Sequence, residues 1–142
     1  MRKKFFLLIL IISFQVMAEE VNGILVFVTQ TQSKQVVGCY NNCEIHILDA
    51  SDNILQSYFG DLPNNSDDAY PIVIEKINSS EWNEIEKKVD DSQKIIIKAF
   101  ELGISKYPAI VINQEFVSYG TTDVNKAIND FYEFEGREIR YE

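Results

Sequence analysis

Two cysteines, Cys39 and Cys43, are the residues best suited to chemistry in this chain of 142 residues. They lie in the stretch GCYNNC, where Gly38, Asn41 and Asn42 provide turn-prone backbone that can bring the sulfurs together. An even cysteine count in an oxidising compartment is typical of a disulfide, and so small a ring contributes about 2 kcal/mol in the chain-entropy model. We therefore expect a structural cross-link that fixes one turn.

A redox-active pair is an alternative interpretation of the same two cysteines. Short disulfide rings can be strained and so more easily reduced, which would suit a thiol-disulfide oxidoreductase or isomerase using Cys39 and Cys43. However, no lysine, arginine or histidine adjoins either cysteine to stabilise a thiolate, and the neighbouring Glu44 would disfavour one.

A metal site is the third interpretation. It would draw four ligands from one short stretch, namely Cys39, Cys43, His46 and Asp49. His46 and Asp49 would point to opposite faces of one strand, and both thiols would have to stay reduced outside the cytoplasm. We expect no metal and no other cofactor.

The remaining polar residues give no catalytic pattern. His46 is the only histidine, and it stands without a serine and a carboxylate at a spacing that would indicate a triad. The pairs Asp67-Asp68 and Asp90-Asp91 are adjacent in sequence, which does not make them face one substrate. No glycine-rich phosphate loop is present. We therefore assign no catalytic residue.

The first residues, MRKKFFLLILIISFQVMAEE, are typical of a secretory signal peptide. A basic start is followed by an apolar run of about ten residues, well short of the roughly 20 that a spanning helix needs. Small residues precede the expected cleavage site after Ala18. This predicts a periplasmic protein with one domain over residues 19–142, without stable membrane insertion once the signal is removed.

The charge of the chain is strongly acidic. Its formal value is −9, and removal of Arg2, Lys3 and Lys4 with the signal moves it to −12. Such a surface repels phosphate backbones at long range, so we expect no direct binding to nucleic acid.

The first half of the domain predicts two strands and two short helices. ILVFVT (24–29) is a continuous apolar run, which is typical of a central strand covered on both faces. A polar loop then leads to the cysteines, and EIHILD (44–49) alternates as a second strand. A short helix is expected from Asp49 or Ser51 to Gly60, and another over 67–78.

The clearest helical pattern follows, with Ser79 or Ser80 as its cap and Gly103 as its end. Apolar residues recur in it at steps of three and four: Trp82, Ile85, Val89, Ile96, Ala99 and Phe100. A polar interruption at 90–92 leaves two helices with a kink as an alternative.

The C-terminal part predicts a hairpin and a last helix. AIVIN (109–113) and FVSY (116–119) are strands joined by a polar turn, and Thr122 or Thr121 can cap the helix after them. A charged tail begins at about residue 133. The order of elements predicts an α/β fold with a mixed, four-stranded sheet and helices on its faces.

The stretch GISKYPAIVINQEFVSYGTTDVNKAI (103–128) carries a resemblance. It is similar to the second half of small thioredoxin-like envelope proteins encoded in integrative conjugative elements, and more distantly to pilus-assembly proteins of conjugative type IV secretion systems. The resemblance implies a thioredoxin-like fold over residues 24–132 and an accessory role in conjugative transfer. The implied partners are envelope proteins of a conjugation or secretion apparatus.

Pro108 opens the third expected strand, where a residue without a backbone donor is tolerated. Taken alone, the Tyr107-Pro108 bond is expected to be trans, whereas the resemblance implies a cis bond. Tyr107, Pro108 and Tyr119 are the candidate partner-binding residues, although the tyrosines could instead pack on the last helix.

Enzymes of the thioredoxin type need Cys-x-x-Cys directly after the first strand, and this chain has TQTQSKQ there. We therefore favour a non-catalytic binding module over an oxidoreductase.

Overall fold

The computed structural model describes residues 20–138. The expected signal peptide (1–18) and the last four residues of the charged tail lie outside the described residues. In chain order the elements are β1 (Ile24–Val28), α1 (Gln30–Ser33), β2 (Cys43–Ile47), α2 (Ala50–Phe59), α3 (Ser66–Ile77), α4 (Trp82–Glu101), β3 (Ala109–Ile112), β4 (Phe116–Tyr119) and α5 (Val124–Glu138).

The four strands form one mixed sheet in the order β2-β1-β3-β4, which confirms the expected α/β class. The parallel pair is β1 with β2, in a register that places Ile24 opposite Cys43 and Val28 opposite Ile47. Strand β3 runs antiparallel to β1, and it forms a hairpin with β4. Strand β1 therefore has a partner on each side, in agreement with the central position that its apolar run predicts.

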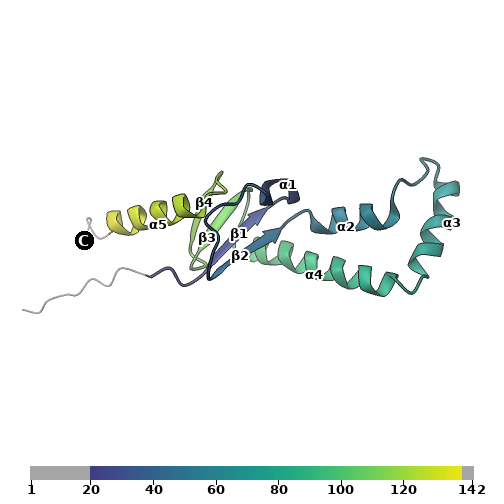
Figure 1. Cartoon of the computed structure of the whole chain (residues 1–142), viewed down its shortest axis with the longest axis horizontal. Helices are drawn as coiled ribbons and strands as arrows, with labels where there is room; N and C mark the ends of the chain where they lie inside the picture. Colours follow the sequence, from purple (N-terminus) through teal and green to yellow (C-terminus); the bar gives the residue numbers. More distant parts are fainter. Residues whose placement is uncertain (1–19, 139–142) are drawn as a thin grey trace, which may run out of the picture.

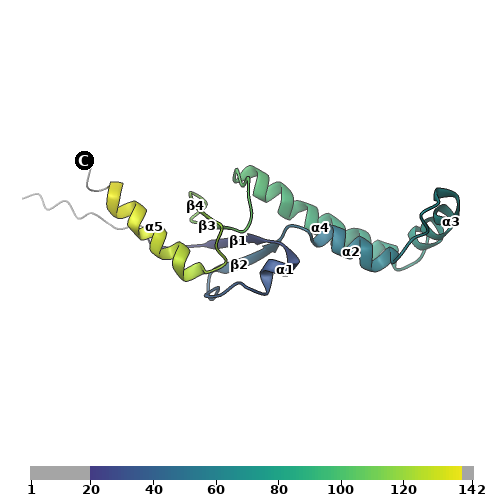
Figure 2. The same ribbon diagram turned by 90° about the horizontal axis from the view of Figure 1, so that it is seen from above.

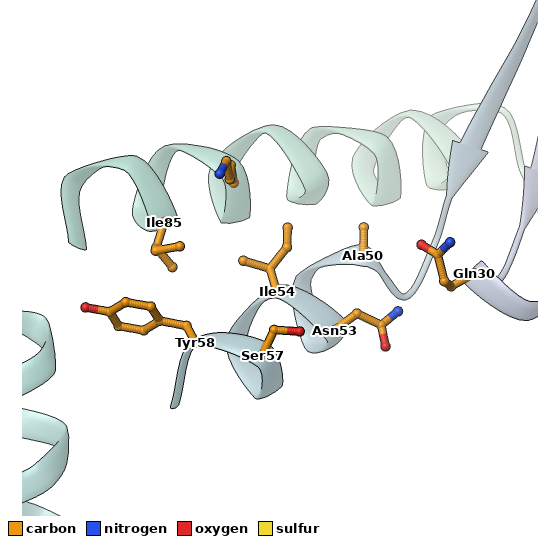
Figure 3. A pocket seen from close by; sticks show the side chains of 8 residues that line it. Gln30, Ala50, Asn53, Ile54, Ser57, Tyr58 and Ile85 are labelled. Atoms are coloured by element: carbon orange, nitrogen blue, oxygen red, sulfur yellow. The ribbon is translucent and has the colours of Figure 1, made fainter. Parts of the chain in front are cut away.

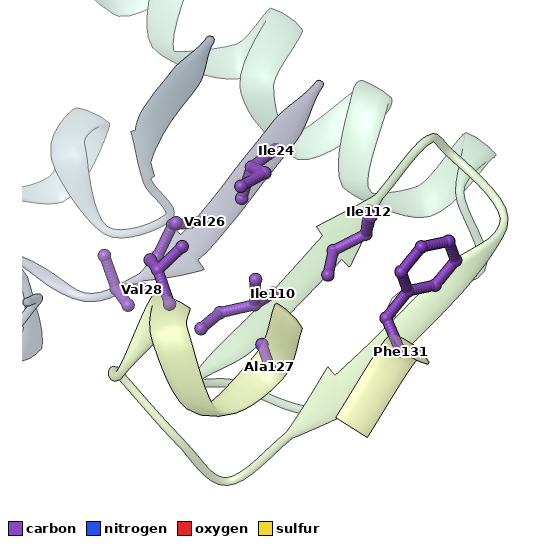
Figure 4. Packing of buried hydrophobic residues seen from close by; sticks show 8 residues of the cluster. Ile24, Val26, Val28, Ile110, Ile112, Ala127 and Phe131 are labelled. Atoms are coloured by element: carbon purple, nitrogen blue, oxygen red, sulfur yellow. The ribbon is translucent and has the colours of Figure 1, made fainter. Parts of the chain in front are cut away.

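Alternate residues of β1 and β3 supply one face of the sheet to a core covered by α5. Figure 4 shows Ile24, Val26 and Val28 beside Ile110 and Ile112, with Ala127 and Phe131 of α5 packed over them. The other residues of the same strands face α4. Phe27 and Val111 are buried there with Ala99. The continuous apolar run of β1 is thus explained, because both of its faces are covered.

The helices between β2 and β3 extend away from the sheet. In Figures 1 and 2, α2 and the first part of α4 lie side by side beyond one end of the sheet, while the last part of α4 runs along the sheet. Helix α3 lies at the tip of this pair, and α5 extends from the opposite end. At the tip, the Tyr58 hydroxyl donates a 2.7 Å hydrogen bond to the carbonyl of Lys76, and the Tyr58 ring lies 5.7 Å from that of Trp82. These contacts join α2, α3 and α4.

One sequence expectation about helices is corrected, and one alternative is decided. The polar loop after β1 contains a short helix, α1, because Thr29 and Gln32 form a capping box there. The segment 90–92 does not break α4, which is one helix of 20 residues. Ser92 is buried, and its hydroxyl donates to the carbonyl of Val89 without disturbing the helix, while Asp91 is exposed and pairs with Lys94.

Both ends of α5 also differ from the expectation. Asp123, in place of Thr122 or Thr121, caps α5, because its carboxylate accepts the backbone N–H groups of Asn125 and Lys126. The helix then continues through the expected charged tail as far as Glu138. Within residues 20–138, no helix combines the length and apolarity needed to cross a membrane.

The burial of Ile110 in the core under α5 can be tested by mutation. Ile110 is fully buried between β1 and α5, so Ile110→Ala should lower the free energy of unfolding by about 2–5 kcal/mol, measured by urea denaturation. Ile97→Ala is the matched control, because Ile97 is 56% exposed on α4; its effect should stay within about 0.5 kcal/mol. Equal effects of the two changes would contradict this assignment of the core.

Candidate functional site

Cys39 and Cys43 form a disulfide at the start of β2, with their Cα atoms 5.3 Å apart. Cys43 is the first residue of the strand and lies opposite Ile24, the first residue of β1. The turn between the cysteines is closed by a 3.2 Å hydrogen bond from the Cys43 N–H to the carbonyl of Tyr40. Asn42 takes a positive φ of 60°, which asparagine tolerates better than most residues. The structure thus contains the cross-link expected from the sequence.

The loop that carries the disulfide is fixed to the start of α5. Val37 donates to the carbonyl of Thr122 at 3.1 Å and accepts from the N–H of Val124 at 3.0 Å. Gly38 has φ +77°, a conformation that favours glycine, and a Cβ there would lie 2.5 Å from Nδ2 of Asn125, so another residue would strain the backbone and displace that side chain. Both cysteines pack against the core under α5. The disulfide therefore holds a loop that covers one face of the sheet.

The position directly after β1 lies at the opposite end of that strand, and it carries no thiol. Thr29 Oγ1 accepts the N–H of Gln32 at 3.2 Å, and Gln32 Oε1 accepts the N–H of Thr29 at 3.0 Å. The next N–H, of Gln30, donates to Asp49 Oδ1 at 2.7 Å. The side chains at the start of α1 thus stabilise the backbone, and none of them is a nucleophilic thiol.

Pro108 lies at this same end of the sheet, one residue before Ala109, which pairs with Phe27. The Tyr107-Pro108 peptide bond is cis. The carbonyl of Pro108 accepts the N–H of Gly120 at 2.9 Å, which brings the segments before β3 and after β4 together. Tyr107 is 58% exposed and Tyr119 is 43% exposed. We call Tyr107, Pro108 and Tyr119 the proline edge.

An apolar hollow of about 320 Å³ adjoins Tyr107. It lies between the end of α4 and the residues just after β2, and its apolar lining consists of Leu48, Ile96, Ala99, Phe100, Ile104 and Tyr107. The sequence pattern placed Ile96, Ala99 and Phe100 on one packed stripe, yet only Ala99 is buried and Phe100 is 83% exposed. The signal that could have shown this is the run Ile95-Ile96-Ile97, which has more apolar residues than one helix face can bury.

A second hollow lies between α2 and α4, with a volume of about 550 Å³ (Figure 3). Ile54 and Tyr58 of α2 and Ile85 of α4 form its apolar wall. Asn53 also lines it, and its Nδ2 is a buried donor without a partner among the described residues. No histidine, cysteine or carboxylate lines this hollow. Its polar lining consists of the amides of Gln30 and Asn53, the hydroxyls of Ser57 and Tyr58 and the ammonium of Lys88, so the lining contains no acid-base pair of the kind that a carboxylate or histidine provides.

His46 is held between the sheet and α4. Its ring stacks on Phe27 with centroids 5.1 Å apart, and Nε2 lies 3.3 Å from Oε2 of Glu44. Burial lowers the pKa of His46, and the positive charge of Lys98 lowers it further, against the opposite effect of Glu44. A neutral, stacked histidine fits a structural role. Among residues 20–138, no three histidine, cysteine, aspartate or glutamate side chains group to hold a metal ion.

The lowered pKa gives His46 a defined effect on stability. The folded chain takes up this proton less readily than the unfolded chain, whose ordinary pKa is 6.5. Stability is therefore lost as the pH falls below that value. Between about pH 7.5 and pH 5.5, the free energy of unfolding should fall more steeply for the natural chain than for His46→Phe, which keeps a ring against Phe27.

Lys98→Gln serves as the control, because it removes one cause of the lowered pKa and should make the fall shallower. The free energy of unfolding would be measured by urea titration at each pH. If it fell equally with pH for the natural chain and for His46→Phe, His46 would not contribute to the pH dependence of stability.

Comparison with known proteins gives one match. No curated protein and no solved structure is significantly similar to the chain. One family model, described as "Protein of unknown function (DUF1525)", matches residues 22–137. This match begins just before β1, ends within α5 and so includes the disulfide, both hollows and the proline edge. Because it spans most of the sequence, the chain belongs to the DUF1525 family.

Proposed function

We propose that this protein is a non-catalytic, exported, thioredoxin-like accessory protein of a conjugative transfer apparatus, which binds other envelope proteins through its proline edge. The geometry of the proline edge and of the disulfide supports a binding role without thiol catalysis. The sequence resemblance over residues 103–128 supports the link to conjugation.

The topology supports a thioredoxin-like fold. Such folds have the strand order β2-β1-β3-β4, with β1 and β2 parallel, β3 reversed and a proline directly before β3. The chain has this order and these directions, and Pro108 occupies that position. It differs in the connection between β2 and β3, where three helices, α2 to α4, extend beyond the sheet.

The position of the disulfide is the observation that carries the non-catalytic role. Cys43 pairs with Ile24, while Ala109, next to Pro108, pairs with Phe27. These two positions are three residues apart on β1, which corresponds to about 10 Å along the strand. A thiol centre of the thioredoxin type adjoins the proline, where this chain has the capping residues Thr29 and Gln32. The disulfide is therefore poorly placed to act on a substrate held at the proline edge.

The proline edge has the composition of a protein-binding site. Tyrosine contributes a large apolar ring and a hydroxyl, and it is enriched among residues that dominate interface energy. Both Tyr107 and Tyr119 expose a large part of their side chains. The adjacent hollow beside Phe100 supplies an apolar recess for a partner side chain.

Export is supported by the basic and apolar opening of the sequence and by the disulfide, since disulfides persist in oxidising compartments. A periplasmic location fits a role in assembling envelope proteins. The strongly acidic charge also favours protein partners over DNA.

Complementation of conjugative transfer tests this proposal. In cells whose conjugative element lacks the gene, the natural chain should restore the transfer frequency, and Tyr107→Ala combined with Tyr119→Ala should reduce it about tenfold or more, because two interface anchors are lost. Cys39→Ser combined with Cys43→Ser should keep transfer within about threefold, since only a cross-link worth about 2 kcal/mol is removed.

Tyr132→Ala is the matched control, because Tyr132 is an exposed tyrosine on α5, away from the proline edge. Unfolding midpoints of all variants show whether they remain folded. Loss of transfer in a folded cysteine variant, together with cysteine-dependent reduction of insulin by the purified chain, would favour the oxidoreductase instead. Transfer that does not depend on the gene would remove the conjugation role.

A further inference from the structure

The surface at the end of α4 combines apolar exposure with positive charge. Four large side chains, Ile96, Ile97, Phe100 and Tyr107, are exposed there, and all of them except Ile97 line the hollow of about 320 Å³. We call these four residues the α4 patch. Soluble proteins rarely leave contiguous apolar groups of this size uncovered unless a partner covers them.

The charge of the same segment is opposite to that of the chain. Residues 92–108 contain Lys94, Lys98 and Lys106 and a single acidic residue, Glu101, in a chain of formal charge −9. Lys94 pairs with Asp91 at 2.7 Å. Lys98 lies 4.0 Å from Glu44 and lines a different hollow with it, so neither lysine adds a charge to the α4 patch. Lys106 lines the hollow, and no ion pair joins it to a described carboxylate. The patch therefore presents a positive charge beside an apolar recess.

From these features we propose that the α4 patch binds a segment of a different protein in which a bulky apolar residue is flanked by aspartate or glutamate. The apolar side chain enters the hollow, whose volume lies near the lower end of the range for binding pockets, roughly 300–1,000 Å³. The flanking carboxylate faces Lys106, the lysine that lines the hollow. The proposal rests on the proposed binding role of the proline edge and specifies its partner.

A second copy of the chain is a poorer occupant. In a twofold dimer the α4 patch of one copy would contact the α4 patch of the other, so the two Lys106 side chains would approach each other. Like charges at an interface oppose association. The charge of the patch instead complements an acidic partner segment.

Selection from a random peptide library displayed on phage tests this specificity with the purified chain. Enriched peptides should combine an aromatic or large aliphatic residue with at least one neighbouring acidic residue. One such peptide, labelled for fluorescence anisotropy, should bind about tenfold or more weakly to Phe100→Ser, which removes the most exposed anchor. Lys106→Glu should weaken binding about threefold or more and reduce its dependence on salt.

Phe134→Ser is the matched control, because Phe134 is also an exposed phenylalanine but lies on α5; it should leave binding within about twofold. Enrichment of basic peptides, no enrichment, or binding unaffected by Phe100→Ser would overturn the inference. So would a dimer of the natural chain that Phe100→Ser dissociates. A redox-active cysteine pair in a chain that still selects acidic, apolar peptides would remove the proposed function and leave this specificity intact.

Discussion

The burial of β1 on both faces is the constraint on which the rest of the structure depends. Every residue from Val26 to Val28 is fully buried, and the strand pairs on both sides. Alternate side chains on β1 and β3 require two separate covers, and α5 and the end of α4 supply them. The chain must therefore pass from one face of the sheet to the other. The loops that connect the faces lie at the ends of the strands, and the candidate sites lie in these loops.

The two ends of β1 differ in what they position. At Ile24, the disulfide and Gly38 hold a loop against α5. The cysteines therefore stabilise the packing on one face of the sheet. At Val28, the capping box of Thr29 closes the strand, and the proline edge and the α4 patch expose aromatic side chains. A redox pair and a peptide-binding edge act together only when they adjoin. Their separation by the length of this strand is what favours binding without thiol chemistry.

Much of this fold could be predicted from periodicity. The apolar run of β1, the hairpin with its turn at Asn113 and the long helix α4 follow from local patterns in the sequence. The cross-link between Cys39 and Cys43 follows from the even cysteine count, the expected export and the turn-prone residues between the two cysteines. Local patterns fail where tertiary contacts decide. The exposure of Phe100 depends on how much of α4 the small sheet can cover, and the role of Asp123 as a cap depends on where the chain turns after β4.

The reduction potential of the Cys39–Cys43 disulfide tests the central claim most directly. The purified chain would be equilibrated with glutathione or dithiothreitol, and its free thiols would be trapped and counted. A structural cross-link packed against the core should have a potential below about −300 mV. A value of about −200 mV or higher, as in thiol oxidants and isomerases, would contradict the account and identify the pair as redox-active.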